Sequence, residues 1–242
     1  LLLGIALTIS GLGGLMWVKS WKVSLATMAV GVGGIFGYHF LYFTAFRFAP
    51  AVEANLFNYL WPLLIVALSP LFLPGTHLKL HHLVGSLIGL IGAGLILSGG
   101  RLHLEGEHLP GYLLMAAAGL TWASYSLLSK RLPPFPTSTV GAFCLVSGFL
   151  ALGIYYISGG SREFPITNLT AGNWLNLFLI GLGPMGAAFF TWDAALKRGD
   201  PRMIGALAYL TPLTSTLVLV SVGGKRLTWV SGIAMLLIIA GA

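Results

Sequence analysis

The sequence contains few charged residues and a single cysteine. Only 8% of its 242 residues are charged, whereas water-soluble domains carry roughly 25%. Apolar residues make up 57% of the chain, and the mean hydropathy is +0.90. No stretch is polar enough to form a soluble domain, so the surroundings of this chain are expected to be mostly lipid. Cys144 alone excludes an internal disulfide framework, and its apolar neighbours predict a small packing residue.

Motifs for catalysis or cofactor binding are also lacking. The apolar segments hold no paired carboxylates, no metalloprotease helix motif and no Ser-His-Asp set. A string from Gly181 to Gly186 fits G-x-G-x-x-G, but no strand precedes it, so a dinucleotide site is excluded. His77, His81 and His82 share one loop without carboxylate or cysteine partners. We therefore expect no metal and no cofactor, and a membrane enzyme is only the second hypothesis. A channel is the third, because it usually needs a polar stripe along a continuous pore.

The net charge of +7 does not indicate a nucleic-acid partner, because the basic residues lie scattered at the ends of apolar segments. The loops on one side carry 8 Lys and Arg and those on the other side carry 5. The positive-inside rule places the richer side in the cytoplasm, together with the C-terminus. The first set is Lys19, Lys22, Lys79, Lys130, Arg131, Lys197, Arg198 and Arg202; the second is Arg47, Arg101, Arg162, Lys225 and Arg226.

Nine apolar segments are long enough to approach the length of about 20 residues that a membrane-spanning helix needs. Backbone groups in lipid must bond internally, so these segments are expected to be helices of an all-α polytopic membrane protein. The first one lacks a charged start and a cleavage site, so it is interpreted as a span and not as a signal peptide. The segments are roughly 1–18, 24–46, 51–73, 80–99, 110–130, 137–158, 171–196, 202–222 and 227–242.

A five-residue pattern, Tyr-Leu-x-Pro-Leu, occurs twice, beginning at Tyr59 and at Tyr209. Aligning the two copies of this pattern predicts a duplication with halves 1–107 and 108–242. The first half shows four helices and the second shows five. Five is an odd number, so the second half enters the membrane from the opposite side, giving an inverted 5+5 repeat of the kind common in secondary transporters. The span at 110–130 has its partner some 40 residues before residue 1, so we expect that a first helix is missing from this sequence.

Prolines within these paired segments predict hinges. A proline removes one helix hydrogen bond, and interrupted helices at matching positions of two repeats point to a central binding site. Pro62 and Pro212 are therefore the expected hinge or gate residues. Glycine pairs with a four-residue spacing, at Gly33 and Gly37 and at Gly85 and Gly89, predict close helix packing.

Polar side chains inside the spans are the candidates for substrate contact, since they are costly in lipid and should face the protein or a cavity. His39 could donate to a ligand, donate to a neighbouring carbonyl as a neutral buried residue, or couple transport to protons. Glu53 is expected to complement the dipole at a helix start and not to be a coupling site, and Asp193 is expected to pair with Lys197 one turn away.

Aromatic residues suggest what the cavity would bind. Trp61 and Trp122 lie deep in their spans and would suit an amphipathic ligand that stacks, or a cation held over a ring. The tryptophans at span ends fit the interfacial belt instead; they are Trp17, Trp21, Trp174 and Trp229. Spacing alone adds five further candidate substrate-binding residues, namely Tyr38, Asn58, Tyr125, Trp192 and Tyr209.

These features together resemble a known family. The run GYHFLYFTAFRFAPAVEANLFNYLWPLL, and within it the string Asn58-Tyr-Leu-Trp-Pro62, is similar to helices of the drug/metabolite transporter superfamily, its EamA-type members and, among them, YddG-type aromatic amino acid exporters. The segment from Trp122 to Tyr125, followed by Lys130, fits the start of the second repeat.

The resemblance implies export of aromatic and other neutral amino acids or related metabolites from the cytoplasm through a bacterial inner membrane. It implies alternating access around a cavity formed by His39, Tyr42, Tyr59, Trp61 and Trp122. Few charges lie in the spans, so uncoupled facilitated diffusion is expected. The alternative is a drug or nucleotide-sugar carrier of the same superfamily, which would need Lys or Arg in the cavity to hold phosphate. The expected partners are a small-molecule substrate and membrane lipid, with the protein acting as a monomer.

Overall fold

The computed structural model describes residues 1–15, 23–222 and 227–241, and within these ranges every regular element is helical. Each of the nine apolar segments contains helix, so the prediction of an all-α chain is confirmed. The long elements are α1 (Leu2–Leu15), α2 (Leu25–Ala45), α3 (Ala51–Asn58), α4 (Leu60–Phe72), α5 (Leu80–Ser98), α6 (Leu109–Ser129), α7 (Thr139–Ile157), α9 (Ala171–Leu182), α10 (Ala188–Arg198), α11 (Pro201–Leu207), α12 (Leu210–Ser221) and α13 (Trp229–Gly241). The short ones are η1 (Gly106–His108), α8 (Gly160–Glu163), η2 (Ile166–Asn168) and a π-helical turn, η3 (Gly183–Ala187).

Among the described residues, six helical stretches are long and apolar enough to cross a membrane. They are Leu25–Ala45, Ala51–Phe72, Leu80–Ser98, Thr139–Ile157, Ala171–Arg198 and Pro201–Ser221. Leu2–Gly14 and Trp229–Gly241 are shorter apolar helices. The helices define a multi-pass membrane protein. Six residues named above lie outside the described ranges, namely Trp17, Lys19, Trp21, Lys22, Lys225 and Arg226.

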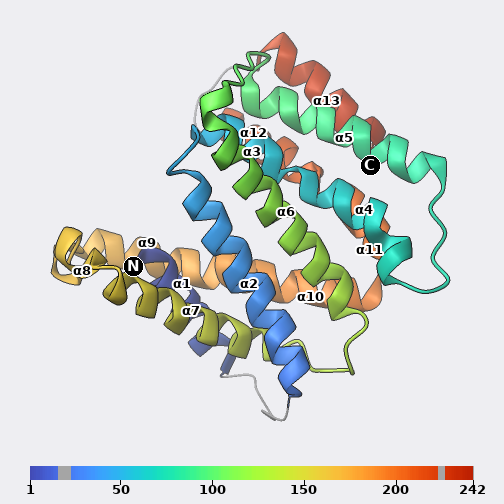
Figure 1. Cartoon of the computed structure of the whole chain (residues 1–242). Coiled ribbons are helices and arrows are strands. Elements are labelled where there is room, and N and C mark those ends of the chain that lie inside the picture. Colours follow the sequence, from blue (N-terminus) through green and yellow to red (C-terminus); the bar gives the residue numbers. More distant parts are fainter. Residues whose placement is uncertain (16–22, 223–226, 242) are drawn as a thin grey trace. The chain divides into compact units, whose positions relative to one another are not determined.

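The helices form two compact units that do not follow the predicted halves of the sequence (Figure 1). Unit 1 contains Leu1–Phe40 and Leu132–Arg198, and unit 2 contains Leu41–Arg131 and Gly199–Ala242. The boundary falls inside α2, after Phe40. Each unit takes helices from both halves, because helices far apart in the sequence pack against each other more extensively than their chain neighbours do.

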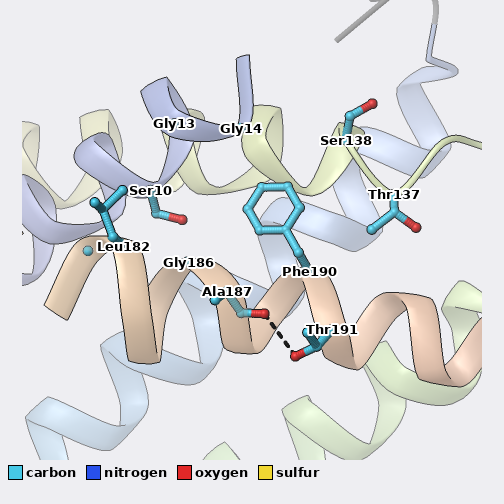
Figure 2. Close-up of a pocket in the computed structure, with 11 residues that line it drawn as sticks. Ser10, Gly13, Gly14, Thr137, Ser138, Leu182, Gly186, Ala187, Phe190 and Thr191 are labelled. Carbon is cyan, nitrogen blue, oxygen red and sulfur yellow. Dashed lines mark hydrogen bonds between the residues drawn. The ribbon is translucent and has the colours of Figure 1, made fainter. Parts of the chain in front are cut away.

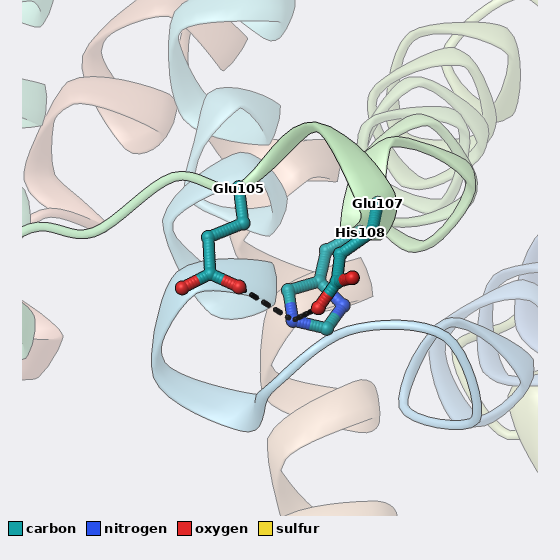
Figure 3. A group of neighbouring side chains, drawn as sticks. All are labelled: Glu105, Glu107 and His108. Carbon is teal, nitrogen blue, oxygen red and sulfur yellow. Dashed lines mark ion pairs between the residues drawn. The ribbon is translucent and has the colours of Figure 1, made fainter.

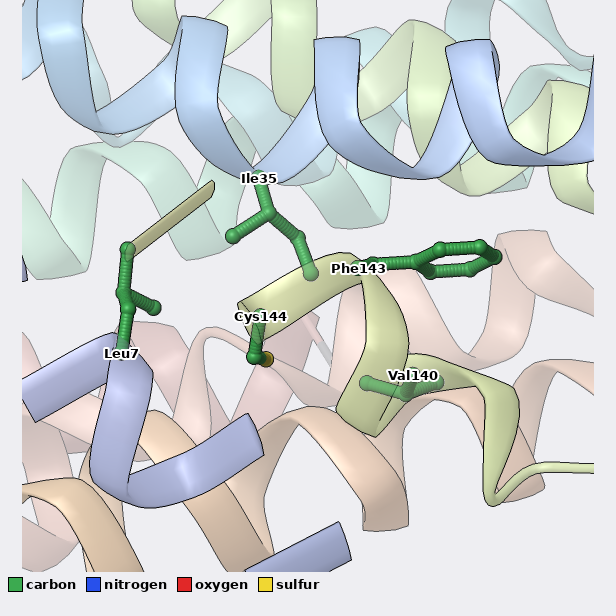
Figure 4. Packing of buried hydrophobic residues seen from close by; sticks show 5 residues of the cluster. All are labelled: Leu7, Ile35, Val140, Phe143 and Cys144. Atoms are coloured by element: carbon green, nitrogen blue, oxygen red, sulfur yellow. The ribbon is translucent and has the colours of Figure 1, made fainter. Parts of the chain in front are cut away.

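Unit 1 is built on the antiparallel pair α1 and α7, which lie side by side in Figure 1. Glycines allow the close approach: a Cβ added at Gly11 would lie 2.7 Å from the Cα of Leu145, and one at Gly141 would lie 2.9 Å from the Cα of Gly14. A core cluster joins α1, α2 and α7 (Figure 4) and consists of Leu7, Ile35, Val140, Phe143 and Cys144. Cys144 is a free, buried packing residue, as predicted.

Unit 2 contains a second antiparallel pair, α5 and α13, also adjacent in Figure 1. Gly85 and Gly241 meet backbone to backbone, since a Cβ at either position would lie within 2.8 Å of the other residue's carbonyl oxygen. The predicted packing role of Gly85 and Gly89 is therefore confirmed. At Gly33 the same prediction is wrong for the described part of the chain, because an added Cβ there would meet no atom within 4 Å. Spacing alone cannot tell a packed glycine from one on an open face.

Helix α6 crosses unit 2 against α3 and α4, and ten of its 21 residues are buried. Its burial explains why α6 can carry tyrosines, a tryptophan and hydroxyl groups without charged residues, and why its apolarity is lower than that of the six stretches above. Polar groups are tolerated in a membrane helix where they face protein and not lipid.

Candidate substrate site

Two helix interruptions in unit 2 occupy matching positions in the repeated pattern. Helix α3 ends at Asn58 and α4 restarts at Leu60, with Tyr59 between them; α11 ends at Leu207 and α12 restarts at Leu210. Pro62 and Pro212 are each the third residue of the restarted helix. A proline there lacks an N–H that the first turn of a helix does not bond internally in any case. The prolines thus follow two restarts and do not kink continuous helices.

The side chain of Tyr59 lines a cavity at the second interruption. This cavity has a volume of about 420 Å³, and its wall also includes Pro212 and the hydroxyl-bearing residues Ser215, Thr216 and Ser231. One predicted substrate-binding residue and one predicted hinge therefore share a single hollow within unit 2. The hydroxyl of Thr216 donates to the carbonyl of Pro212 at 2.8 Å, one turn earlier in the same helix, α12.

Tyr209 lies differently. Its side chain is only 1% exposed and belongs to a core cluster with Ala93, Leu213 and Ile238. Its hydroxyl donates to the carbonyl oxygen of Tyr59 at 3.0 Å and accepts from the N–H of Leu63 at 3.2 Å. The two tyrosines of the repeated pattern, 150 residues apart, are thus joined by a hydrogen bond.

Further candidate residues gather around α3, α4 and α6. The hydroxyl of Tyr42 donates to Oδ1 of Asn55 at 2.8 Å, which bonds the end of α2 to α3. Both Asn58 and Trp61 approach Gly119 of α6: an added Cβ there would lie 3.1 Å from the Asn58 carbonyl and 3.5 Å from the Trp61 nitrogen. One turn further along α6, the rings of Trp122 and Tyr125 lie 5.3 Å apart and are tilted.

In unit 1 the candidate His39 is 5% exposed. Its Nδ1 lies 2.7 Å from the carbonyl oxygen of Ile35, and since a carbonyl only accepts, Nδ1 carries the proton. This hydrogen bond is the one expected if His39 is a neutral buried residue that donates to a neighbouring carbonyl. The rings of Tyr38 and Phe189 lie edge to face with the imidazole, with ring centres 5.0 and 5.7 Å from its centre. Phe189 was not among the predicted site residues. Its position three residues before Trp192, on the same face of a helix, could have indicated it.

Asp193 forms the predicted ion pair with Lys197, and Asp193 is buried while the lysine is partly exposed. The ammonium group also lies 4.0 Å from the centre of the Phe135 ring and donates to the hydroxyl of Thr137 at 3.3 Å. Three types of partner therefore hold Lys197 inside unit 1. In unit 2 the ammonium of Lys130 donates to the carbonyl of Gly199 at 2.7 Å.

The ten candidate substrate-binding residues divide between the units. Tyr38, His39 and Trp192 belong to unit 1. The other seven belong to unit 2 and are Tyr42, Asn58, Tyr59, Trp61, Trp122, Tyr125 and Tyr209. Their roles as substrate contacts stay predictions. Trp174 and Trp229, assigned to the interfacial belt, are 42% and 90% exposed.

Unit 1 also contains a larger hollow that holds none of the ten candidates. It has a volume of about 600 Å³ and lies between α1, the start of α7 and the segment α9–η3–α10 (Figure 2). The glycine string from Gly181 to Gly186 forms part of its wall, and it is helical, which agrees with the rejection of a dinucleotide site. The wall is mostly apolar, and the ring of Phe190 projects into the space between the helices.

A polar cluster outside the spans ties two loops of unit 2 together (Figure 3). The Nε2 atom of His108 lies 3.7 Å from a carboxylate oxygen of Glu105 and 3.6 Å from one of Glu107. Its Nδ1 lies 3.0 Å from the carbonyl oxygen of Phe48, in the connection between α2 and α3. These contacts fasten the start of α6 to that connection, and the two carboxylates are otherwise exposed.

The arrangement is that of a multi-pass helical membrane protein with interrupted helices, a class that includes many carriers of small molecules. The profile of the EamA-like transporter family matches residues 1–98 and 109–242. The chain therefore belongs to the EamA-like transporter family and is a membrane transporter of small molecules. Because the family and the relatives below are transporters, the membrane-enzyme hypothesis is set aside.

Similar proteins include two called aromatic amino acid exporter YddG. The one from Ancylobacter novellus is 42% identical over 214 residues, which is 88% of this chain and 72% of that protein. The one from Salmonella typhimurium is 27% identical over 69% of this chain and 57% of that protein. An uncharacterized transporter, YyaM of Bacillus subtilis, is 22% identical over 84% of this chain and 67% of its own length. A solved crystal structure with 38% identity covers 99% of this chain and 85% of its own, with a TM-score of 0.90.

Proposed function

We propose that this chain exports aromatic and other neutral amino acids, or related metabolites, from the cytoplasm across a bacterial inner membrane. The similarity to aromatic amino acid exporter YddG supports the substrate class. The observation that carries the mechanism is the pair of matching helix interruptions at Tyr59 and Tyr209. Such interruptions give a helix a place to bend beside a mid-membrane site.

An inverted repeat with halves 1–107 and 108–242, spanning the membrane nine times in this sequence, is part of the proposal. If the halves are related by a two-fold axis in the membrane plane, a helix near that axis packs antiparallel against its own counterpart. Helices α1 and α7 occupy the same position in the two halves, and so do α5 and α13. Each pair packs antiparallel, which supports this symmetry. The separate family matches to residues 1–98 and 109–242 support the same division.

In the proposed cycle the substrate stacks on Trp61 and Trp122 and bonds to His39 and to nearby tyrosine and asparagine groups, including Tyr42 and Tyr59. Movement around Pro62 and Pro212 closes access from one side and opens it from the other. The substrate must also be released, so we expect dissociation constants in the high micromolar to millimolar range, which correspond to about 4–6 kcal/mol. No coupling ion is needed. The distribution of loop charges supports a cytoplasmic C-terminus as part of the proposal, and a monomer in lipid suffices.

The nucleotide-sugar alternative is less well supported by the basic residues nearest to the spans. Phosphate recognition calls for a free Arg or Lys facing the cavity. Lys197 is held by Asp193, Phe135 and Thr137, and Lys130 is bonded to the backbone of Gly199. Arg47, the third basic residue near the spans, is exposed in the connection between α2 and α3. Amino acid substrates require no such cation.

The test is uptake of labelled tryptophan, phenylalanine and threonine into liposomes that contain the protein, with no ion gradient. We expect uptake that equilibrates and is competed by unlabelled amino acid. Trp61→Ala should lower the uptake rate at least about tenfold, the equivalent of about 1.4 kcal/mol. Trp229→Ala is the matched control, because that side chain is 90% exposed. Uptake that survives Trp61→Ala intact contradicts the stacking site, and uptake that appears only with a proton gradient contradicts the uncoupled mechanism.

A further inference from the structure

The hydroxyl of Tyr209 bonds to the two backbone groups that form the first hydrogen bond of α4, which begins at Leu60. In a regular helix the N–H of Leu63 donates to the carbonyl of Tyr59, four residues earlier. Here the hydroxyl donates to that carbonyl at 3.0 Å and accepts from that N–H at 3.2 Å. The side chain thus shares the donor and the acceptor of the first hydrogen bond of α4, directly after the interruption at Tyr59.

The Tyr209 ring is held so firmly that its hydroxyl has little freedom to move. The residue is 1% exposed and packs against Ala93 of α5 and Ile238 of α13. It also lies against Gly89, where an added Cβ would come within 2.6 Å of the ring carbon Cδ2. Thus α5 and α13, the closely packed pair of unit 2, fix the position from which the hydroxyl reaches α4.

Tyr209 also sits at the interruption of its own helix, between α11 and α12. Its backbone N–H donates to the carbonyl of Ala206 at 3.1 Å, in the turn that ends α11. A change in the angle between α11 and α12 therefore acts on Tyr209, whose ring is held by α5 and α13, and strains the two bonds of its hydroxyl at the start of α4. The contact links the two interrupted helices mechanically.

We propose that Tyr209 is a positioning residue for transport: its hydroxyl is a latch that couples the interruption between α3 and α4 to the interruption between α11 and α12. This inference rests on the proposed function, in which both interruptions move during transport. It assigns Tyr209 a role in the movement and not in substrate contact, which differs from the expectation drawn from the sequence. The substrate affinity should then be independent of the hydroxyl, whereas the turnover should depend on it.

The decisive variant is Tyr209→Phe, which keeps the ring and removes only the hydroxyl. The variant removes a buried hydroxyl that makes two hydrogen bonds. Maximal uptake of labelled tryptophan into liposomes should therefore fall roughly three- to tenfold, and KM should change less than about twofold. Amide hydrogen exchange in the segment around Leu63 should become faster, because its N–H loses an acceptor. The melting temperature in detergent shows whether the variant is folded.

Tyr112→Phe is the matched control. Tyr112 is also a buried tyrosine of unit 2, and its hydroxyl has no hydrogen-bond partner among the described residues. This variant should leave turnover, KM and exchange around Leu63 unchanged.

The outcomes separate the latch from the proposed function. Unchanged turnover in a folded Tyr209→Phe protein overturns the latch, and so does a loss confined to KM, which would make Tyr209 a substrate contact. Unchanged exchange around Leu63 overturns the hydrogen bond itself. If the unmodified protein takes up no amino acid, the proposed function fails, and the exchange measurement still tests the contact. Should Tyr209→Phe not fold, Gly89→Ala is the second variant, since it displaces the ring while keeping the hydroxyl.

Discussion

Tyr59 and Tyr209 begin the same five-residue pattern and stand at matching helix interruptions, yet their side chains have different surroundings. Tyr209 is buried, and its hydroxyl bonds to the backbone at the start of α4. Tyr59 is half-buried and lines a cavity with Pro212. A duplicated sequence therefore gives the same backbone feature twice, while the packing around each copy decides what its side chain does. The hydroxyl of Tyr209 fastens helices together, whereas Tyr59 lines a cavity.

The largest difference should appear when each tyrosine is truncated. Tyr209→Ala removes a ring from the core between α5, α12 and α13, and should lower the free energy of unfolding by about 3–5 kcal/mol. Tyr59→Ala removes a half-buried ring that lines a cavity and packs against the edge of the same cluster, so it should cost less, about 1–2 kcal/mol. Thermal or denaturant unfolding in detergent measures both. Equal losses would mean that the two side chains are equally structural.

The kinetic effects should be opposite in kind. Tyr59→Phe should raise KM for tryptophan about threefold with turnover nearly unchanged, because a hydrogen bond to substrate is worth roughly 0.5–1.5 kcal/mol. Tyr209→Phe should lower turnover with KM nearly unchanged. Initial uptake rates over a range of tryptophan concentrations separate the two parameters. A similar profile for both variants would remove the distinction between contact and latch.

A smaller effect is expected from the glycines of α5 beneath the Tyr209 ring. Gly89→Ala places a methyl group 2.6 Å from ring carbon Cδ2, so the ring must shift, and we expect a loss of about 1–3 kcal/mol. Gly94→Ala lies on the same helix, but its methyl group would meet only the Leu56 side chain at 3.7 Å. That control should stay within about 0.5 kcal/mol. Equal melting temperatures for both variants would show that the ring is not tightly held.

The smallest effect concerns the start of α11, the helix that leads to Tyr209. Asp200 caps α11 by accepting from the N–H of Arg202 at 2.9 Å, and hydrogen bonds from the Arg202 guanidinium hold the pKa of the carboxyl below its usual range. The stabilising effect of Asp200 is therefore complete above its ordinary pKa of about 3.9 and is lost as the pH falls through the lowered folded-state pKa.

Two substitutions test this cap. Asp200→Ala should cost about 1 kcal/mol at pH 7. Asp200→Asn keeps the cap and should cost less, because only the charge is lost. Melting temperatures of both variants at pH 7 and at about pH 3 provide the check. If the difference between Asp200→Ala and the unmodified chain is as large at pH 3 as at pH 7, the carboxylate charge has no role.

Local chemistry in the sequence predicted the helices, the Asp193–Lys197 pair and the packing of Gly85 and Gly89. The ion pair and the glycine spacing involve residues one helical turn apart. The helices follow from the apolar composition of segments that face lipid instead of water. The bond between Tyr209 and Leu63 could not be predicted, because it joins residues 146 apart and depends on how α5 orients a ring. The division into units was missed for the same reason, since pairing of α1 with α7 is a property of packing. The π-helical turn at Gly183–Ala187 was not predicted, because the sequence shows only a glycine-rich string there.

The most direct test of the coupling between the two interruptions is the turnover of four proteins: the unmodified chain, Pro62→Ala, Tyr209→Phe and the double variant. If Tyr209 acts on the start of α4, where Pro62 lies, Tyr209→Phe should slow tryptophan uptake in the unmodified background and have little further effect once Pro62 is alanine. The coupling free energy would then be nonzero, as expected for residues that share a network. Effects that multiply independently in the double variant would contradict the latch and leave Tyr209 as a packing residue.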